Sequence, residues 1–120
     1  SVFTMLFELK GDTVYVDGVP KIKNVRLNVE GNAFRIKGKV LEGDKFILKD
    51  YIVKMNFSFP KGEVHGIENV SKKVFRFSIS GNFLKRSIKV DGSIDFQEIH
   101  HEASSLEDAK NFVLKTILTI

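Results

Sequence analysis

The chain of 120 residues is long enough for one domain with its own core, so we expect a single domain over residues 1–120. Hydrophobic residues make up 42% and charged residues 28%, a globular composition that argues against intrinsic disorder. The net charge of +4 comes from Lys and Arg residues spread among acids, so specific nucleic-acid binding is not expected.

Alternating apolar and polar residues, interrupted by short turn sequences, predict an antiparallel meander over most of the chain. Gly11-Asp12, Gly31-Asn32, Gly43-Asp44 and Gly81-Asn82 are typical of hairpin turns, and Asp91-Gly92 predicts a bulge or turn. The segments that favour strands are residues 3–9, 13–16, 22–30, 33–41, 45–59, 64–70, 74–80, 83–90 and 94–100. Because the signals over residues 10–21 and 64–70 are weak, we expect about six to eight strands.

The hydrophobic period changes to that of a helix after Ala103. Ser104 and Glu107 have the spacing of a capping box, in which the two side chains satisfy free backbone amides of the first turn. The following residues form one apolar stripe at helical spacing: Leu106, Ala109, Val113, Ile117 and Ile120. We therefore expect an α+β fold in which a curved sheet packs on one long C-terminal helix.

Few residues carry a pattern that indicates catalysis or metal binding. The absence of cysteine excludes thiol nucleophiles and thiolate metal sites. His100 and His101 are adjacent and point to opposite faces of a strand, and sequence alone does not bring His65 to either, so we expect no metal and no cofactor. Ser104 and Ser105 fit helix caps better than nucleophiles, so we expect a non-enzymatic binding protein. An enzyme in which a pocket acid or His acts on a bound substrate is the alternative that the sequence leaves open.

No apolar run reaches the ~18 to 20 residues that span a bilayer. Residues 1–10 lack the features of a secretory signal, so the cytoplasm is the expected compartment. Peripheral membrane contact is left open, and the sequence does not indicate an oligomeric state.

The aromatic residues are almost all apolar, with 11 Phe, 2 Tyr and no Trp. Such side chains suit either a solid core or an apolar pocket, and the sequence leaves both readings open.

The segment Val19-Pro20-Lys21-Ile22-Lys23-Asn24-Val25, followed by Val29 to Phe34 and by Gly38-Lys39, resembles the second strand and its successors in the helix-grip fold of the START-like (SRPBCC) superfamily. The resemblance covers residues 19–120. Within the superfamily, this segment is similar to an archaeal START-like family of unassigned function. Members usually place two short helices between the first two strands, where this chain has only residues 10–21. The resemblance implies a cavity between sheet and helix that holds a lipid, a sterol or an aromatic metabolite, and some members are cyclases or hydrolases.

A second resemblance is to the pleckstrin-homology fold. Lys73-Val74-Phe75-Arg76-Phe77 looks like its late strand, and Ala103-Ser104-Ser105-Leu106-Glu107 looks like the start of its helix, with Phe112 in place of the usual tryptophan. This resemblance implies an interaction module whose basic residues around Gly81-Asn82 meet a phosphoinositide or a protein.

We predict that the protein binds a hydrophobic or lipid-like small molecule between the sheet and the helix. The predicted lining consists of Leu27, Phe34, Ile36, Phe75, Phe77, Ile94, Phe96 and Val113.

Overall fold

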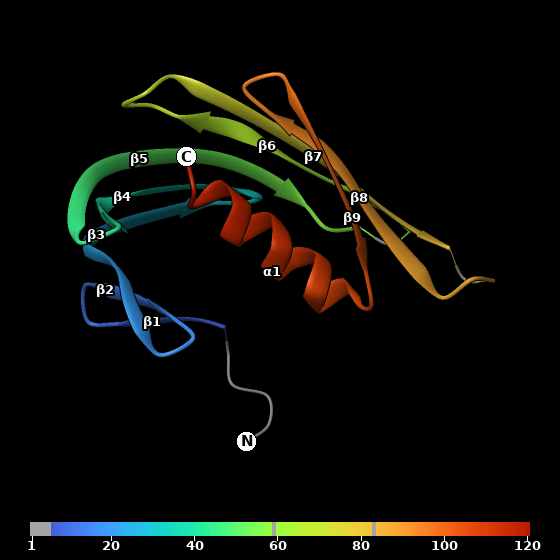
Figure 1. Cartoon of the computed structure of the whole chain (residues 1–120), viewed down its shortest axis with the longest axis horizontal. Helices are drawn as coiled ribbons and strands as arrows, with labels where there is room; N and C mark the ends of the chain where they lie inside the picture. Colours follow the sequence, from blue (N-terminus) through green and yellow to red (C-terminus); the bar gives the residue numbers. More distant parts are fainter. Residues whose placement is uncertain (1–5, 59, 83) are drawn as a thin grey trace.

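A computed structural model describes residues 6–58, 60–82 and 84–120, which form one open antiparallel sheet and one helix (Figure 1). The nine strands lie side by side in chain order, so every neighbouring pair is a hairpin. They are β1 (Phe7–Lys10), β2 (Thr13–Val16), β3 (Val19–Glu30), β4 (Ala33–Glu42), β5 (Lys45–Asn56), β6 (Lys61–Glu68), β7 (Lys73–Asn82), β8 (Ser87–Ile94) and β9 (Gln97–Ala103), and the helix is α1 (Leu106–Ile117).

The predicted α+β class, antiparallel meander and C-terminal helix are confirmed. The strand number is higher than the predicted six to eight, because both weak segments form paired strands, β2 and β6. Among the described residues, no helix combines the length and the apolar character that crossing a membrane requires.

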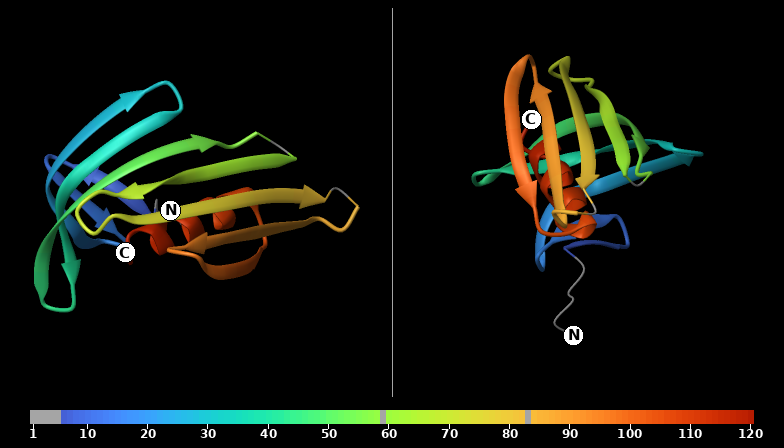
Figure 2. Two further views of the ribbon diagram at one scale, coloured as in Figure 1. Left: turned by 90° about the horizontal axis from the view of Figure 1, so that it is seen from above. Right: turned by 90° about the vertical axis from the view of Figure 1, so that its right-hand side faces the viewer.

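The helix lies across one face of the sheet, which we call the inner face, and it comes closest to β7, β8 and β9. Figure 1 also shows β5 curving over the C-terminal end of α1, and Figure 2 shows the same bend in β3 and β4. In both figures the opposite face of β6, β7 and β8, which we call the outer face, is not covered by α1. The curved half of the sheet therefore stands away from the helix, and the straighter half packs on it.

The buried core joins the inner face to the helix. Ala109, Val113 and Ile117 of α1 are buried, as the predicted apolar stripe requires. They belong to one cluster with side chains of the strands: Val14, Ile22, Val40, Tyr51, Val53, Val64, Phe75, Phe77, Ile79 and Val90. Ala103 and the final residues Leu118 and Ile120 complete this cluster.

Two glycines on the inner face leave space for phenylalanine rings of the neighbouring strand. Gly66 is the cross-strand partner of Phe75, and Gly92 is the cross-strand partner of Phe77. A Cβ atom at Gly92 would collide first with the backbone carbonyl oxygen of Arg76 and would also meet the Phe77 ring at 2.5 Å. One at Gly66 would collide first with the backbone carbonyl oxygen of Ile52 and would also meet the Phe75 ring at 2.9 Å. Each ring therefore occupies the space that a side chain on the neighbouring strand would need.

Two predicted turns are wrong. Gly81-Asn82 belongs to β7, where the N–H of Gly81 also donates to the carbonyl oxygen of Pro60 at 2.7 Å. Asp91-Gly92 lies inside β8, and the chain turns instead at Asp95 and Phe96, whose φ angles are 49° and 71°. Gly31-Asn32 and Gly43-Asp44 do connect strands as predicted, with φ angles of 57° at Gly31 and 62° at Gly43.

Phe3, Phe59 and Phe83, at which three of the predicted strands begin or end, lie outside the described residues.

The helix cap is displaced by one residue from the prediction. Ser105, not Ser104, is the N-cap, and its hydroxyl oxygen accepts a hydrogen bond from the N–H of Asp108 at 3.0 Å. The carboxylate of Asp108, not that of Glu107, accepts a hydrogen bond from the N–H of Ser104 at 2.9 Å. This backbone hydrogen bond lowers the pKa of Asp108, and the nearby His101 lowers it further.

A buried carboxylate fixes the connection between β6 and β7. Glu68 is fully buried and accepts hydrogen bonds from three backbone N–H groups: Asp50 at 2.9 Å, Val70 at 2.9 Å and Ser71 at 2.7 Å. Burial alone raises the pKa of Glu68, but the three hydrogen bonds together outweigh burial and lower it. The charged form of Glu68 is therefore the form that the fold requires.

Candidate functional site

The candidate site is a chamber between the inner face of the curved half of the sheet and the C-terminal half of α1. Its volume is about 270 Å³. We call it the inner chamber, and it is lined by Phe7, Glu8, Leu9, Val14, Ile22, Phe34, Ile36, Tyr51, Val53, Leu114, Ile117 and Leu118. Because α1 lies closest to β7, β8 and β9, the space left by the bend of β3 to β5 is not filled by the helix.

The lining of the inner chamber is almost wholly apolar. Glu8 alternates with Phe7 and Leu9 along β1, so its side chain points to the opposite face of the strand from theirs. Its carboxylate pairs with Lys10, which shares that face, at 3.8 Å. Of the lining residues that the structure describes, Tyr51 is then the single one that contributes a polar side chain to the wall. An occupant of this chamber would be held by burial of apolar surface.

The rim of the chamber is the free edge of the sheet at β1. Leu9 is 50% exposed there, although its side chain shares the inner face with the buried Val14 across the strand pair. An exposed leucine at the edge of an apolar chamber gives a ligand an apolar path from solvent.

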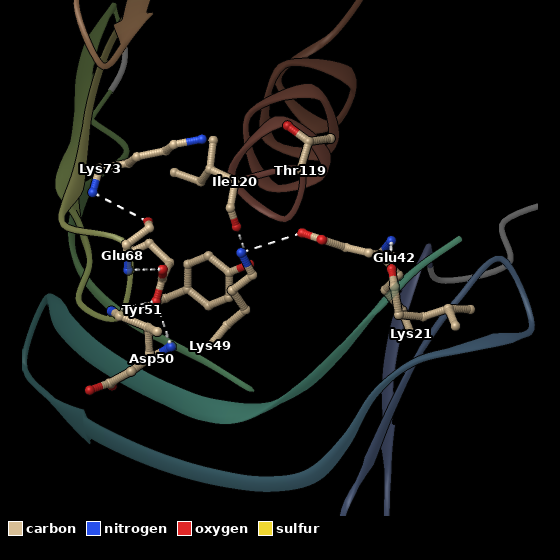
Figure 3. Close-up of polar contacts among 12 residues, drawn as sticks. Lys21, Glu42, Lys49, Asp50, Tyr51, Glu68, Lys73, Thr119 and Ile120 are labelled. Atoms are coloured by element: carbon tan, nitrogen blue, oxygen red, sulfur yellow. Dashed lines mark hydrogen bonds and ion pairs between the residues drawn. The ribbon is translucent and has the colours of Figure 1, made fainter. Parts of the chain in front are cut away.

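A group of polar contacts lies next to Tyr51, near the C-terminal end of α1 (Figure 3). The Tyr51 hydroxyl donates a hydrogen bond to the carbonyl oxygen of Ile120 at 3.1 Å. Lys49, whose side chain is only 12% exposed, pairs with Glu42 at 3.3 Å, and Lys21 donates to the carbonyl oxygen of Leu41 at 2.7 Å. Burial of Tyr51, together with Glu68 and Glu42, raises the pKa of its hydroxyl. Tyr51 therefore stays protonated and anchors the C-terminal residue to the sheet.

Of the eight residues predicted to line a pocket, two line the inner chamber and six do not. Phe34 and Ile36 line the inner chamber. Phe75, Phe77 and Val113 are buried in the core between sheet and helix, and Ile94 lies beside the C-terminal end of the helix, near Thr119.

Leu27 and Phe96 do not reach the inner chamber. Leu27 is paired with Ile36 on the inner face but is 49% exposed, because the β3–β4 hairpin extends past the area that α1 covers. Phe96 lies in the β8–β9 turn and is 87% exposed.

Most of the chamber wall was not predicted. Ile22 was missed because Asn24 has a φ of 55° at a bulge in β3, which breaks the simple alternation between Ile22 and Leu27. Tyr51 and Val53 were missed because Ile52 between them is also apolar, so their strand shows no clear face. Leu114, Ile117 and Leu118 follow the i, i+3, i+4 spacing, and this signal could have placed them on the wall.

The histidines are placed apart from the inner chamber. His100 pairs with Asp91 at 2.7 Å on the outer face, and His101 stacks on Phe112 of the helix with 4.0 Å between ring centroids. The hydrogen bond to Asp91 is the main cause that raises the pKa of His100. In the part of the chain that the structure describes, no group of three or more His, Asp or Glu side chains could hold a metal ion.

Comparison of the chain with protein-family models, with curated proteins and with solved structures finds no match.

Proposed function

We propose that the protein binds an uncharged, apolar small molecule in the inner chamber. The observation that carries this proposal is an open space of about 270 Å³ in which the only polar side chain that the described residues contribute, Tyr51, is already hydrogen-bonded to Ile120. A volume of this size lies near the lower end of small-molecule sites. A charged ligand head would find no partner on the wall, so burial of a charge there would be unfavourable.

Binding rather than catalysis fits this wall. General acid–base chemistry needs a titratable group within hydrogen-bond reach of the substrate, at a pKa near the working pH. The raised pKa of Tyr51 and its bond to Ile120 leave it unsuited to that role.

The START-like resemblance is supported by the curved sheet and the C-terminal helix that crosses it, and it stays part of the proposal. The chain departs from that superfamily at the first connection, where Gly11 and Asp12 join β1 directly to β2. In our proposal the β1 edge therefore takes the place of the two helices that form the cavity mouth in that superfamily.

The test is a pair of tryptophan variants, since the natural chain has no Trp and each variant then carries a single fluorophore. Ile36→Trp fills part of the inner chamber, whereas Ile52→Trp places the same ring on the outer face of the adjacent strand. The natural protein and both variants are incubated with a panel of fatty alcohols, fatty acids and a sterol, and retained ligand is measured by native mass spectrometry.

We expect the natural protein and Ile52→Trp to retain an uncharged member of the panel and to gain thermal stability from it. Ile36→Trp should retain less and should report the ligand as a shift in its fluorescence. Retention of no panel member by the natural protein, or equal retention by the two variants, contradicts the proposal.

A second candidate function, contact with an anionic membrane, is favoured by the connection between β7 and β8. Leu84 is 96% exposed, and its N–H and that of Lys85 both donate to the side-chain oxygen of Asn82, at 3.0 Å and 3.3 Å. The turn thus holds an apolar side chain in solvent beside Lys85 and Arg86. A leucine flanked by two cations suits insertion among anionic lipid headgroups.

Sedimentation with vesicles of phosphatidylcholine and phosphatidylserine tests this candidate. We expect salt-sensitive binding that Leu84→Ser weakens and that charge reversal at Lys85 and Arg86 abolishes. Binding that survives the charge reversal contradicts it.

A further inference from the structure

A hollow larger than the inner chamber is a groove on the outer face of β6, β7 and β8. Its volume is about 580 Å³, and we call it the outer groove. Three polar side chains cross its floor as neighbours on adjacent strands, since Arg76 pairs with His65 on one side and with Ser93 on the other. Val74 and Phe96 form its apolar side.

Phe96 is an unusual residue for the turn in which it lies. Both turn residues have positive φ angles, 49° at Asp95 and 71° at Phe96, a backbone that normally selects Asn-Gly or Asp-Gly. A bulky aromatic residue there strains the backbone, and its ring gains little burial in return because it is 87% exposed. Neither the turn nor the core therefore explains a phenylalanine at this position.

The groove also contains a cation, Arg76. Arg76 is exposed and takes part in none of the ion pairs formed by the described residues, whereas Arg35 on the same face is neutralised by Asp50 at 2.7 Å. Among the described residues, no acidic side chain lines the groove. Lys54 is the cross-strand neighbour of His65, and Glu98, which pairs with His100 at 3.6 Å, is the cross-strand neighbour of Ser93. A free guanidinium beside an exposed aromatic ring suits an anion that carries a flat ring.

We propose that the outer groove binds a small aromatic anion, with its ring stacked on Phe96 and its phosphate or carboxylate on Arg76. Ser93 and His65 would supply further hydrogen bonds to the anionic group. The outer groove and the inner chamber lie on opposite faces of the sheet and suit different ligands. This proposal therefore does not depend on whether the inner chamber binds an apolar molecule.

The experiment uses the whole chain and three probes: adenosine monophosphate, 2-naphthoate and uncharged adenosine. Binding is measured by amide chemical-shift titration, which also locates the probe on the outer face or elsewhere. We expect at least one of the two anions to bind at the groove, and adenosine to bind about tenfold or more weakly than adenosine monophosphate if phosphate is the favoured group. The more tightly bound anion shows whether the natural ligand carries phosphate or carboxylate.

Two variants test the two halves of the site. Arg76→Gln should weaken anion binding about tenfold, whereas Lys45→Gln, which removes the same charge beside the exposed β4–β5 turn, should leave it unchanged. Phe96→Gly should weaken it about tenfold through lost stacking, and because glycine suits a positive φ, the variant should unfold at the same temperature or higher.

Loss of binding in a variant that is at least as stable as the natural protein separates a ligand contact from a structural role. The proposal is overturned if neither anion shifts the resonances of the groove, or if the anions bind Arg76→Gln and Phe96→Gly as tightly as the natural protein. A marked loss of thermal stability in Phe96→Gly also contradicts it, because the ring would then serve the fold.

Discussion

Replacing Glu68 by Gln removes one charge from the interior while changing the size of the side chain very little. In the natural protein Oε2 accepts from the N–H groups of Asp50 and Val70, and Oε1 accepts from that of Ser71. A glutamine retains one oxygen, so its amide NH₂ must face at least one of these donors. The variant therefore removes the acceptor of at least one of these three backbone N–H groups.

The cost follows from the strength of the lost bonds. Hydrogen bonds to a charged acceptor contribute about 1.5–3 kcal/mol each, and neutral ones about 1 kcal/mol. The variant loses one hydrogen bond to a charged acceptor and weakens two others, while a neutral group is easier to bury. Together these effects should lower the free energy of unfolding by about 2–4 kcal/mol. For a domain of this size that is a large share of a total stability of about 5–15 kcal/mol.

Denaturant unfolding at pH 7 measures the loss, with Glu63→Gln as the matched control, because Glu63 is exposed on the same strand. The pKa of Glu68 is lowered by folding, so its contribution is complete above the ordinary glutamate pKa of about 4.3 and is lost as the pH falls through the folded value. The difference between Glu68→Gln and the natural protein should therefore shrink below about pH 4. A difference under about 0.5 kcal/mol at pH 7, or one that is unchanged in acid, would refute the reasoning.

Three further substitutions test the packing, the outer-face ion pair and the helix cap. Gly92→Ala should cost about 3 kcal/mol in the free energy of unfolding, because its Cβ has no room beside the carbonyl oxygen of Arg76 and the Phe77 ring; a loss below about 1 kcal/mol would show that the sheet adapts. Asp91→Asn should lower the pKa of His100, read by NMR titration, towards the ordinary value of about 6.5, and an unchanged pKa would contradict the assigned ion pair. Ser105→Ala should destabilise the protein by about 1 kcal/mol in thermal or denaturant unfolding, whereas Ser104→Ala should have a smaller effect if Ser105 is the cap.

The sequence was sufficient for the elements whose local signals agree with one another. The hairpins at Gly31 and Gly43 combine a turn glycine with clear alternation on both sides, and the stripe of α1 repeats at helical spacing. Alternation also placed Phe34 and Ile36 on a common inner face, and both line the inner chamber.

Prediction failed where tertiary contacts decide the conformation. The sequence Asp91-Gly92 looks like a turn, but Gly92 lies in a strand, where the ring of its cross-strand partner Phe77 occupies the space that a side chain would need. Asp95 and Phe96 carry no turn glycine at all, so nothing local marks the place where the chain reverses. The inner chamber depends on how far the curved strands stand from α1, and that distance is a property of the whole sheet.

The strand order of the sheet bears on how the chain reaches its native state. Each strand pairs only with those before and after it in the chain, so nearly all backbone pairing joins residues of small sequence separation. Low relative contact order of this kind predicts faster folding than in β-sandwiches of similar length, in which distant segments must meet first. The hydrogen bond from Tyr51 to Ile120 joins residues that are 69 positions apart in the chain. We therefore expect α1 to dock on the sheet, and the inner chamber to form, as the last step of folding, after the hairpins have paired.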